Sequence, residues 1–210
     1  MSRAAPTPGE LRAAAHAPLD TQREVFERAV RANGTLARAL EALEPDEWVG
    51  AGAVFQGVWN LMSGEACDAH IKDLDVLYFD ASDLSAQAEA ARARREAPGG
   101  LELDVVNVAR VHLWYEEVFG SAIPQYESVA HSVATWPTQC SAFAVRRGEE
   151  GGIEVIAPFG FHDLFAGWIR PNKVQISREV YEAKVARWTA TWPWLLAWGW
   201  DEGERPERQS

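Results

Sequence analysis

The spacing of apolar residues along the chain predicts a mixture of helices and strands. Apolar side chains recur every three or four positions over residues 21–32, 35–43 and 54–62, which is the spacing of one buried helical face. A longer helix is expected to begin after Ser177, a residue type that often caps helices. Residues 71–80 instead alternate in steps of two, which predicts a strand.

The predicted strand at residues 71–80 would divide its side chains between two faces. One face would carry Leu74, Val76 and Tyr78, and the other would carry Ile71, Asp73, Asp75, Leu77 and Phe79. A helix over about residues 82–96 and a second strand over 101–108 follow, and strand–helix–strand at this spacing indicates an α/β unit. Residues 141–147 and 153–157 predict a hairpin.

Length and composition fit one globular domain. The chain has 210 residues, of which 47% are hydrophobic and 24% are charged, far from the composition of disordered chains. We expect a single domain over residues 20–200, a flexible Ala/Pro-rich segment over 1–19 and a flexible acidic tail over 201–210. No stretch approaches the roughly 18 apolar residues of a membrane span, and no apolar signal region begins the chain, so a cytoplasmic location without membrane contact is expected.

The charge balance argues against one large class of function. Lys and Arg number 20 against 31 Asp and Glu, a formal charge of −11, whereas proteins that bind along nucleic acids carry clustered cations. Bulk nucleic-acid binding is therefore not expected, although a local basic groove stays open. Cys67 and Cys140 lack metal-ligand spacing, and the five histidines form no zinc-binding motif.

Partial motifs of other enzyme folds fail at defined positions. Gly50-Ala51-Gly52 resembles part of a dinucleotide-binding fingerprint, but Phe55 stands where the third glycine is needed. The preceding residues 44–47 also lack the pattern of a buried strand. The chain contains no P-loop sequence and no Gly-x-Ser-x-Gly nucleophile elbow.

Three aspartates form the pattern with the clearest chemistry. Asp73 and Asp75 lie two apart in the predicted strand, so their carboxylates project from the same face. Asp104 lies in the next predicted strand, and if the two strands are neighbours all three acids could share a cation. Hard oxygen ligands at an open site suit Mg²⁺ or Mn²⁺. The alternative is a solvated sheet edge, since an Asp-x-Asp pair also arises by chance.

The surroundings of these acids resemble a known superfamily. Gly52-Ala53 leads into the helix at 54–62, and backbone N–H groups at such a helix start can approach an anion closely. Glycine, helix, Asp-x-Asp strand and a third acid on a following strand resemble, in this order, the DNA polymerase β-type nucleotidyltransferase superfamily. More narrowly, the chain resembles a bacterial nucleotidyltransferase-like family. The resemblance spans residues 20–195 and is carried by the stretches 51–60, 71–80, 107–115, 157–165 and 170–172.

The resemblance implies an α/β fold, with a small mixed sheet flanked by helices and with helical additions at both ends. It also implies a metal-dependent enzyme that moves a nucleoside monophosphate from an NTP such as ATP to an unidentified acceptor, by a two-metal, three-carboxylate mechanism. Asp73 and Asp75 would hold the Mg²⁺ or Mn²⁺ ions with the triphosphate, and Asp104 would hold the ion nearest the attacking group. Gly52 and Ala53 would contribute backbone N–H groups to nucleotide binding.

Three departures from the family pattern bear on activity. Ala53 stands where the superfamily often has Ser, Val108 stands where the family usually has Gln, and the spacing from Gly52 to Asp73 is longer than usual. Lys72 and Arg110 are the candidates for phosphate contacts, because a guanidinium pairs well with phosphate. The alternative for both is a surface ion pair with an acidic residue.

Two other functions stay open at this stage. The protein could be a catalytically degenerate member that binds a nucleotide or a partner, which the Ala53 and Val108 departures favour. It could also be a metal-dependent phosphoester hydrolase, which uses the same ions with water as the acceptor. The sequence does not fix the acceptor, the base preference or the oligomeric state.

Overall fold

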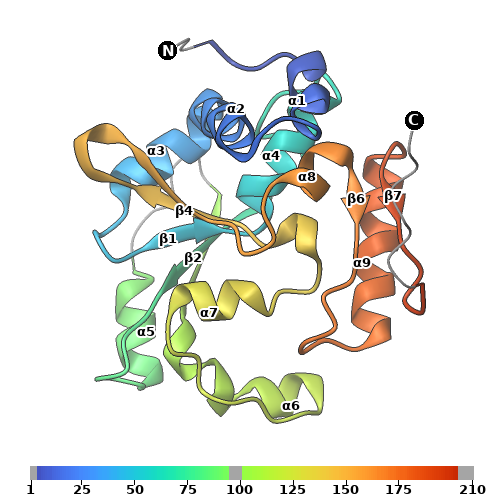
Figure 1. Ribbon diagram of the computed structural model, residues 1–210. Helices are drawn as coiled ribbons and strands as arrows, with labels where there is room; N and C mark the ends of the chain where they lie inside the picture. The colour runs from blue at the N-terminus through green and yellow to red at the C-terminus, as the bar shows by residue number, and fades with distance from the viewer. Residues whose placement is uncertain (1–3, 95–100, 203–210) are drawn as a thin grey trace.

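The computed structural model describes residues 4–94 and 101–202 of the chain (Figure 1). The strands within these residues are β1 (Trp48–Gly50), β2 (Asp73–Tyr78), β3 (Glu102–Asn107), β4 (Ala144–Arg147), β5 (Ile153–Ile156), β6 (Trp168–Ile169) and β7 (Leu196–Ala197). The α-helices are α1 (Pro8–Ala14), α2 (Leu19–Ala32), α3 (Gly34–Ala42), α4 (Gly52–Met62), α5 (Ala86–Arg92), α6 (Tyr115–Phe119), α7 (Val129–Ala134), α8 (His162–Ala166) and α9 (Arg178–Thr191). Short 3₁₀ helices include η2 (Val108–Leu113), η3 (Gln139–Ser141) and η4 (Glu149–Gly151).

The main sheet is mixed and has the strand order β3-β2-β1-β4-β5. β2 and β3 are parallel and are joined by a crossover that contains α5, whereas β1 is antiparallel to both β2 and β4, and β4 is antiparallel to β5. The α/β unit and the hairpin expected from the sequence are therefore both present. The predicted fold class, a small mixed sheet flanked by helices, is confirmed.

The two faces of β2 belong to different cores, as the alternating pattern predicts. Leu74, Val76 and Tyr78 are buried in a large core that includes residues of α2, α3 and α4. Leu77, which shares its face with Asp73 and Asp75, belongs to a second, smaller core with residues of η2 and α7. Figure 1 accordingly shows α2 and α4 on one side of the sheet and α6 and α7 on the other.

Several helix starts differ from the sequence-based expectation. α2 begins at Leu19, and α3 is capped by the Asn33 side chain, which accepts a hydrogen bond from the Leu36 N–H, so that Thr35 lies inside the helix. α5 is shorter than the helix expected over 82–96, and Ser85 caps it. The end expected for that helix lies partly outside the described residues. α9 does begin directly after its predicted cap, Ser177, whose hydroxyl accepts from the Val180 N–H.

The N-terminal segment contains a helix that the hydrophobic pattern does not predict. A reciprocal pair of hydrogen bonds between Thr7 and Glu10 caps α1, and its Leu11 is fully buried in the main core. Arg12 adds a hydrogen bond to the Met62 carbonyl at the end of α4. The seven residues of α1 make only about two turns, which is too short to display a clear 3.6-residue period. The hydrophobic pattern therefore does not reveal this helix. The division into a 20–200 domain and two flexible ends stays a prediction, since residues 1–3 and 203–210 lie outside the described part.

The tryptophans of the C-terminal region fix α9 against α4. Trp59 of α4 packs edge-on against Trp188 and Trp192, with ring centroids 5.6 and 5.4 Å apart. The Trp192 Nε1 donates to the buried Asn60 side chain at 3.2 Å, so the contact is also directional. These indoles are core residues, as expected for a tryptophan-rich segment. No helix among the described residues is long and apolar enough to cross a membrane.

Gly50 creates space on the acidic face of the sheet. It is the register partner of Asp75 in the β1–β2 pair. A Cβ atom at Gly50 would lie 2.6 Å from Cη2 of Trp136 and 3.1 Å from Cδ1 of Leu77, both shorter than normal contacts. The indole of Trp136 can therefore lie against the sheet beside Asp75 only because position 50 has no side chain.

We predict that Gly50→Ala destabilises the protein by about 1–3 kcal/mol, the usual cost of adding a methyl group to a packed site. The displaced Trp136 would also change its fluorescence. Gly34→Ala is the matched control, because its nearest neighbour is 3.7 Å away and alanine suits a helix better than glycine. Chemical denaturation measures both effects, and equal stability of the two variants would contradict the prediction.

Candidate active site

The parallel register of β2 and β3 brings the predicted acids onto one face. Asp75 lies directly opposite Asp104, and Asp73 lies opposite Glu102. Because residues opposite each other in a sheet share a face, and residues two apart in a strand do so as well, four carboxyl groups lie on the same side of the sheet. The sequence predicts three of them, and Glu102 is the fourth.

Burial and repulsion by acidic neighbours raise the pKa values of Asp75 and Asp104. The pKa of Asp75 rises to about 7, chiefly because the group is largely removed from water, and further because Asp73 and Asp104 lie nearby. Lys184 and a backbone hydrogen bond from Gly52 lower it in part. The pKa of Asp104 is also raised, first by burial and then by its acidic neighbours. The cluster therefore disfavours negative charge as long as no cation offsets it.

The start of α4 faces these acids with a strained backbone. Ala51, which precedes the helix, has φ 50° and ψ −129°, a region that residues with a side chain rarely adopt. Such a conformation costs of the order of 1–3 kcal/mol and is often found at functional sites. No side chain caps α4 from the preceding turn, but the Gly52 N–H bonds to the Asp75 carboxyl group, while the Ala53 N–H is not used by a capping residue. This end of the helix can receive an anion.

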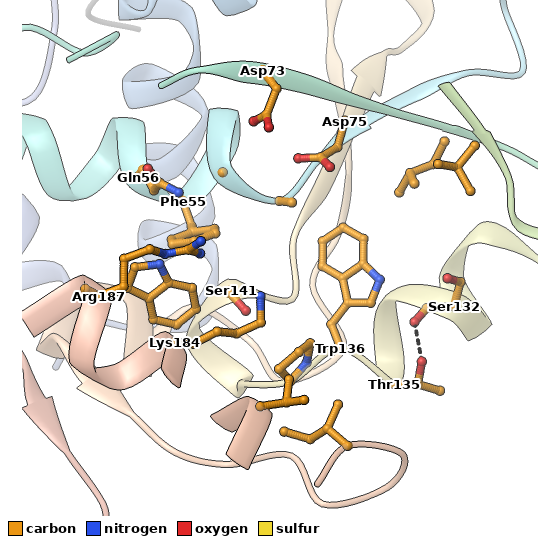
Figure 2. A pocket seen from close by; sticks show the side chains of 18 of the residues that line it. Phe55, Gln56, Asp73, Asp75, Ser132, Thr135, Trp136, Ser141, Lys184 and Arg187 are labelled. Atoms are coloured by element: carbon orange, nitrogen blue, oxygen red, sulfur yellow. Dashed lines mark hydrogen bonds between the residues drawn. The ribbon is translucent and has the colours of Figure 1, made fainter. Parts of the chain in front are cut away.

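The acidic face forms one wall of a large cavity (Figure 2). Its volume is about 810 Å³, within the range of roughly 300–1,000 Å³ that small-molecule sites occupy. Figure 2 shows Asp73 and Asp75 at the wall formed by the sheet, and Lys184 and Arg187 of α9 across from them. Trp136 lies between Asp75 and Ser132 of α7. The cavity is therefore bounded by the sheet, the start of α4, α7 and α9.

Lys184 and Arg187 are cationic residues of the cavity that the sequence did not indicate. They lie three apart on α9 and so share a face of the helix. Both cations also lie near the Trp188 ring, with distances of 5.8 and 6.0 Å to its centroid. Lys184 is half-buried, and burial together with Arg187 lowers its pKa, while Asp75 raises it. The spacing on the helix was visible in the sequence, but nothing there indicated that α9 would face the acids.

The predicted site residues lie in three different settings. Gly52, Lys72, Asp73 and Asp75 line the cavity. Ala53 is buried at the start of α4, and Asp104 borders the pair from β3 with its side chain partly in solvent. Arg110 instead forms an ion pair with Glu89 at 2.5 Å and donates to the Leu84 carbonyl at 3.2 Å. Its phosphate role stays a prediction, and its observed partner is the ion pair that the sequence left as the alternative.

The carboxyl groups fit a divalent cation that takes part of its ligands elsewhere. Among the described residues, no group of three or more His, Cys, Asp or Glu side chains has the arrangement of a complete metal site. Asp73 and Asp75 nevertheless offer hard oxygen donors at an open cavity, and Mg²⁺ commonly binds one or two carboxylates together with water and substrate phosphates. Burial and the neighbouring acids raise the pKa of Asp75, and a bound cation would favour its charged form. The donor set therefore suits Mg²⁺ or Mn²⁺ bound with a phosphate.

Asp75 makes the stability of the metal-free protein depend on pH. Its pKa is about 7 in the folded protein against 3.8 ordinarily, so between these values the folded state holds a proton that the unfolded chain releases. The free energy of unfolding therefore falls as the pH rises from about 4 through about 7. We predict that Asp75→Asn removes this loss of stability. Its free energy of unfolding should exceed that of the wild type by roughly 1–3 kcal/mol at pH 8 and differ little from it at pH 4.

Chemical denaturation in the presence of a chelator at both pH values measures this effect. Asp20→Asn, a change at an exposed position in the first turn of α2, is the control and should follow the wild type. An Asp75→Asn variant that is less stable than the wild type at pH 8 would contradict the prediction.

Comparison with known proteins assigns the chain to a family. A family described as nucleotidyltransferase matches residues 38–197, which is most of the chain. A solved structure described as revealing a CCA-adding enzyme head domain shares the fold, with a TM-score of 0.68 and 22% sequence identity over 84% of this chain and 95% of that one. No curated protein matches the sequence. The protein belongs to the nucleotidyltransferase family, and its sheet with the acidic face has the fold of a nucleotidyltransferase head domain.

Proposed function

We propose that the protein transfers a nucleoside monophosphate from an NTP to the hydroxyl group of an acceptor. The observation that carries the proposal is the β2–β3 register, which sets Asp75 beside Asp104 and puts Asp73 on the same face. This face borders a cavity that also receives Lys184 and Arg187. Acids and cations that meet in one cavity match the needs of a metal–triphosphate substrate.

The triphosphate would bind between α4 and α9. The Ala53 N–H can donate to a phosphate oxygen, and the Gly52 N–H, which bonds to Asp75, lies beside it at the same end of the helix. Lys184 and Arg187 supply positive charge from the opposite side. Ala53 has no hydroxyl group, so at this position the backbone would act without the side-chain contact that a serine provides. The cations of α9 offset that loss, and Lys72 at the cavity wall is a further candidate.

Asp73 and Asp75 would hold Mg²⁺ or Mn²⁺ together with the triphosphate, and Asp104 would act on the side of the acceptor. When bound, the ions supply charge neutralisation on the phosphates and in-line alignment of the reacting groups. The acceptor oxygen forms a bond to the α-phosphorus while the bond from that phosphorus to the bridging oxygen breaks, and pyrophosphate leaves. The hydroxyl proton passes to a carboxylate oxygen of Asp104, whose raised pKa suits a base.

Two features favour a binding protein without catalysis as the second candidate. Ala53 and Val108 replace the residues that the family usually has. Val108 is almost fully buried and lines the cavity, so a polar contact is replaced by an apolar one there. Transfer of the α-phosphorus of a labelled NTP to any acceptor would eliminate this candidate. Release of labelled monophosphate to water alone would point to a phosphoester hydrolase instead.

We predict that ATP with Mg²⁺ raises the Tm of the wild-type protein and that Asp73→Asn loses most of this rise. The variant should keep its fold, because Asp73 is exposed and asparagine has nearly the same size. Turnover should fall at least about 1,000-fold, in line with removing a key electrostatic contact of a transition state. Asp20→Asn is the control. If no NTP, whichever base it carries, raises the Tm of the wild type in the presence of Mg²⁺, the proposed function is refuted.

We predict that Lys184→Met weakens Mg²⁺–ATP binding by roughly 10- to 100-fold, the usual worth of one hydrogen bond to a charged group. Arg178→Met is the matched control, because Arg178 lies on the same helix but pairs with Asp201 at the surface. Arg110→Met tests the sequence-based assignment, and it should bind ATP like the wild type if its role is the ion pair with Glu89. Titration calorimetry measures all three, and unchanged affinity in Lys184→Met would contradict the α9 assignment.

A further inference from the structure

The cavity continues past the acids into a second, apolar end. This end is lined by Val106 and Leu77 of the sheet, Val108 and Val111 of η2, and aromatic rings of the segment that follows, Trp114, Tyr115, Phe119 and Tyr126. Most of these residues belong to the smaller core of the protein. None of these described lining residues is cationic, whereas Lys184 and Arg187 lie at the other end, so the cavity has one charged end and one aromatic end. We call this second part the aromatic chamber.

Val106 lies two residues after Asp104 on the same face of β3, so the aromatic chamber begins beside the acid that would act on the acceptor. Along the sheet, the start of α4 follows β1, the acids Asp73 and Asp75 lie on β2, and Asp104 and Val106 lie on β3. In an in-line displacement the attacking and leaving groups lie on opposite sides of the phosphorus. If the leaving pyrophosphate contacts α4 and α9, the attacking group approaches from β3, where Val106 begins the wall of the chamber.

A hydroxyl group on the wall of the chamber can bond to a polar group of a ligand. Ser132 is 95% buried and lines the cavity, and its hydroxyl has no hydrogen-bond partner among the described residues. Its backbone carbonyl is used instead, by the Thr135 hydroxyl at 2.8 Å. The nearby Tyr126 hydroxyl is already used, since it bonds to Thr135 and to Gln175. The Ser132 hydroxyl is not one of the buried side-chain atoms that lack a partner in the described part of the chain, so it is reached from the cavity and can bond to a molecule there.

We propose that the acceptor is a small molecule with a planar apolar body and a hydroxyl group, bound in the aromatic chamber, and not a nucleic acid. This inference rests on the proposed function and names the class of its second substrate. The rings of Trp136 and Tyr115 suit stacking on a planar body, and the Ser132 hydroxyl suits a polar substituent. A nucleic-acid acceptor would need cations along its backbone, whereas the chamber lining offers apolar side chains and the whole chain carries a charge of −11.

The test uses the full chain and 2-naphthol, a planar, uncharged probe that carries one hydroxyl group. Its binding is measured by titration calorimetry, with and without Mg²⁺ and an ATP analogue whose bond between the α- and β-phosphorus atoms cannot be cleaved. We expect the wild type to bind the probe and Ser132→Phe, which fills the chamber, to bind it at least about tenfold more weakly. Ser132→Phe should keep its affinity for the Mg²⁺–ATP analogue, because the two ends are separate.

Two further variants keep the test decisive. Ala130→Phe adds the same ring to the exposed side of α7 and should bind the probe like the wild type. Phe119→Ala removes a half-exposed ring at the chamber and should weaken probe binding even if Ser132→Phe does not fold.

Three results would overturn the inference. These are no probe binding by the wild type, equal binding by wild type, Ser132→Phe and Phe119→Ala, or tight binding of a hairpin RNA that displaces the probe. Probe binding with no binding of the ATP analogue would instead overturn the proposed function, and with it the acceptor role of the chamber. The two binding measurements therefore distinguish failure of the acceptor inference from failure of the proposed function.

Discussion

Electrostatic repulsion among carboxylates held on one face of a sheet is the constraint around which the rest of the site is arranged. The parallel pairing of β2 and β3 places Asp75 directly beside Asp104, and burial of Asp75 strengthens the repulsion between the two carboxylates. A fold that only had to be stable would place an apolar residue at position 75. The surrounding structure offsets the charge with the Gly52 backbone and with Lys184, and the raised pKa shows that the offset is partial.

Under the proposed function, the same arrangement would let an acidic protein bind a triphosphate. The formal charge of −11 repels a bare triphosphate, and the acidic face repels it most strongly. Under the proposed function, two divalent cations would cancel the four negative charges of the carboxylates on this face, which removes the repulsion. The cations of α9 and the start of α4 would then contact the phosphates from outside the acidic face. The net charge of the chain therefore does not predict which ligand the cavity can bind, because binding depends on the charges that line it.

The sequence predicted most of the sheet and part of the site, for identifiable reasons. β2 alternates cleanly because its two faces enter different cores, so its register of side chains was readable in advance. The expected cap at Ser177 and the expected hairpin of β4 and β5 were also found, because each depends on a few neighbouring residues. α1 was missed because seven residues show too little periodicity. Arg110 was a candidate for phosphate contact with an ion pair as the alternative; it pairs with Glu89, and no local pattern distinguishes the two roles.

The sequence by itself determined that Asp73 and Asp75 share a face, because a strand repeats every two residues wherever it lies in a fold. Only the tertiary structure decided that Asp104 lies beside Asp75, since the partner and direction of a strand depend on contacts between distant segments. It also decided that Lys184 and Arg187 face these acids, through indoles that lock α9 onto α4. Local periodicity is a property of the backbone, whereas a cavity exists only where separate elements meet.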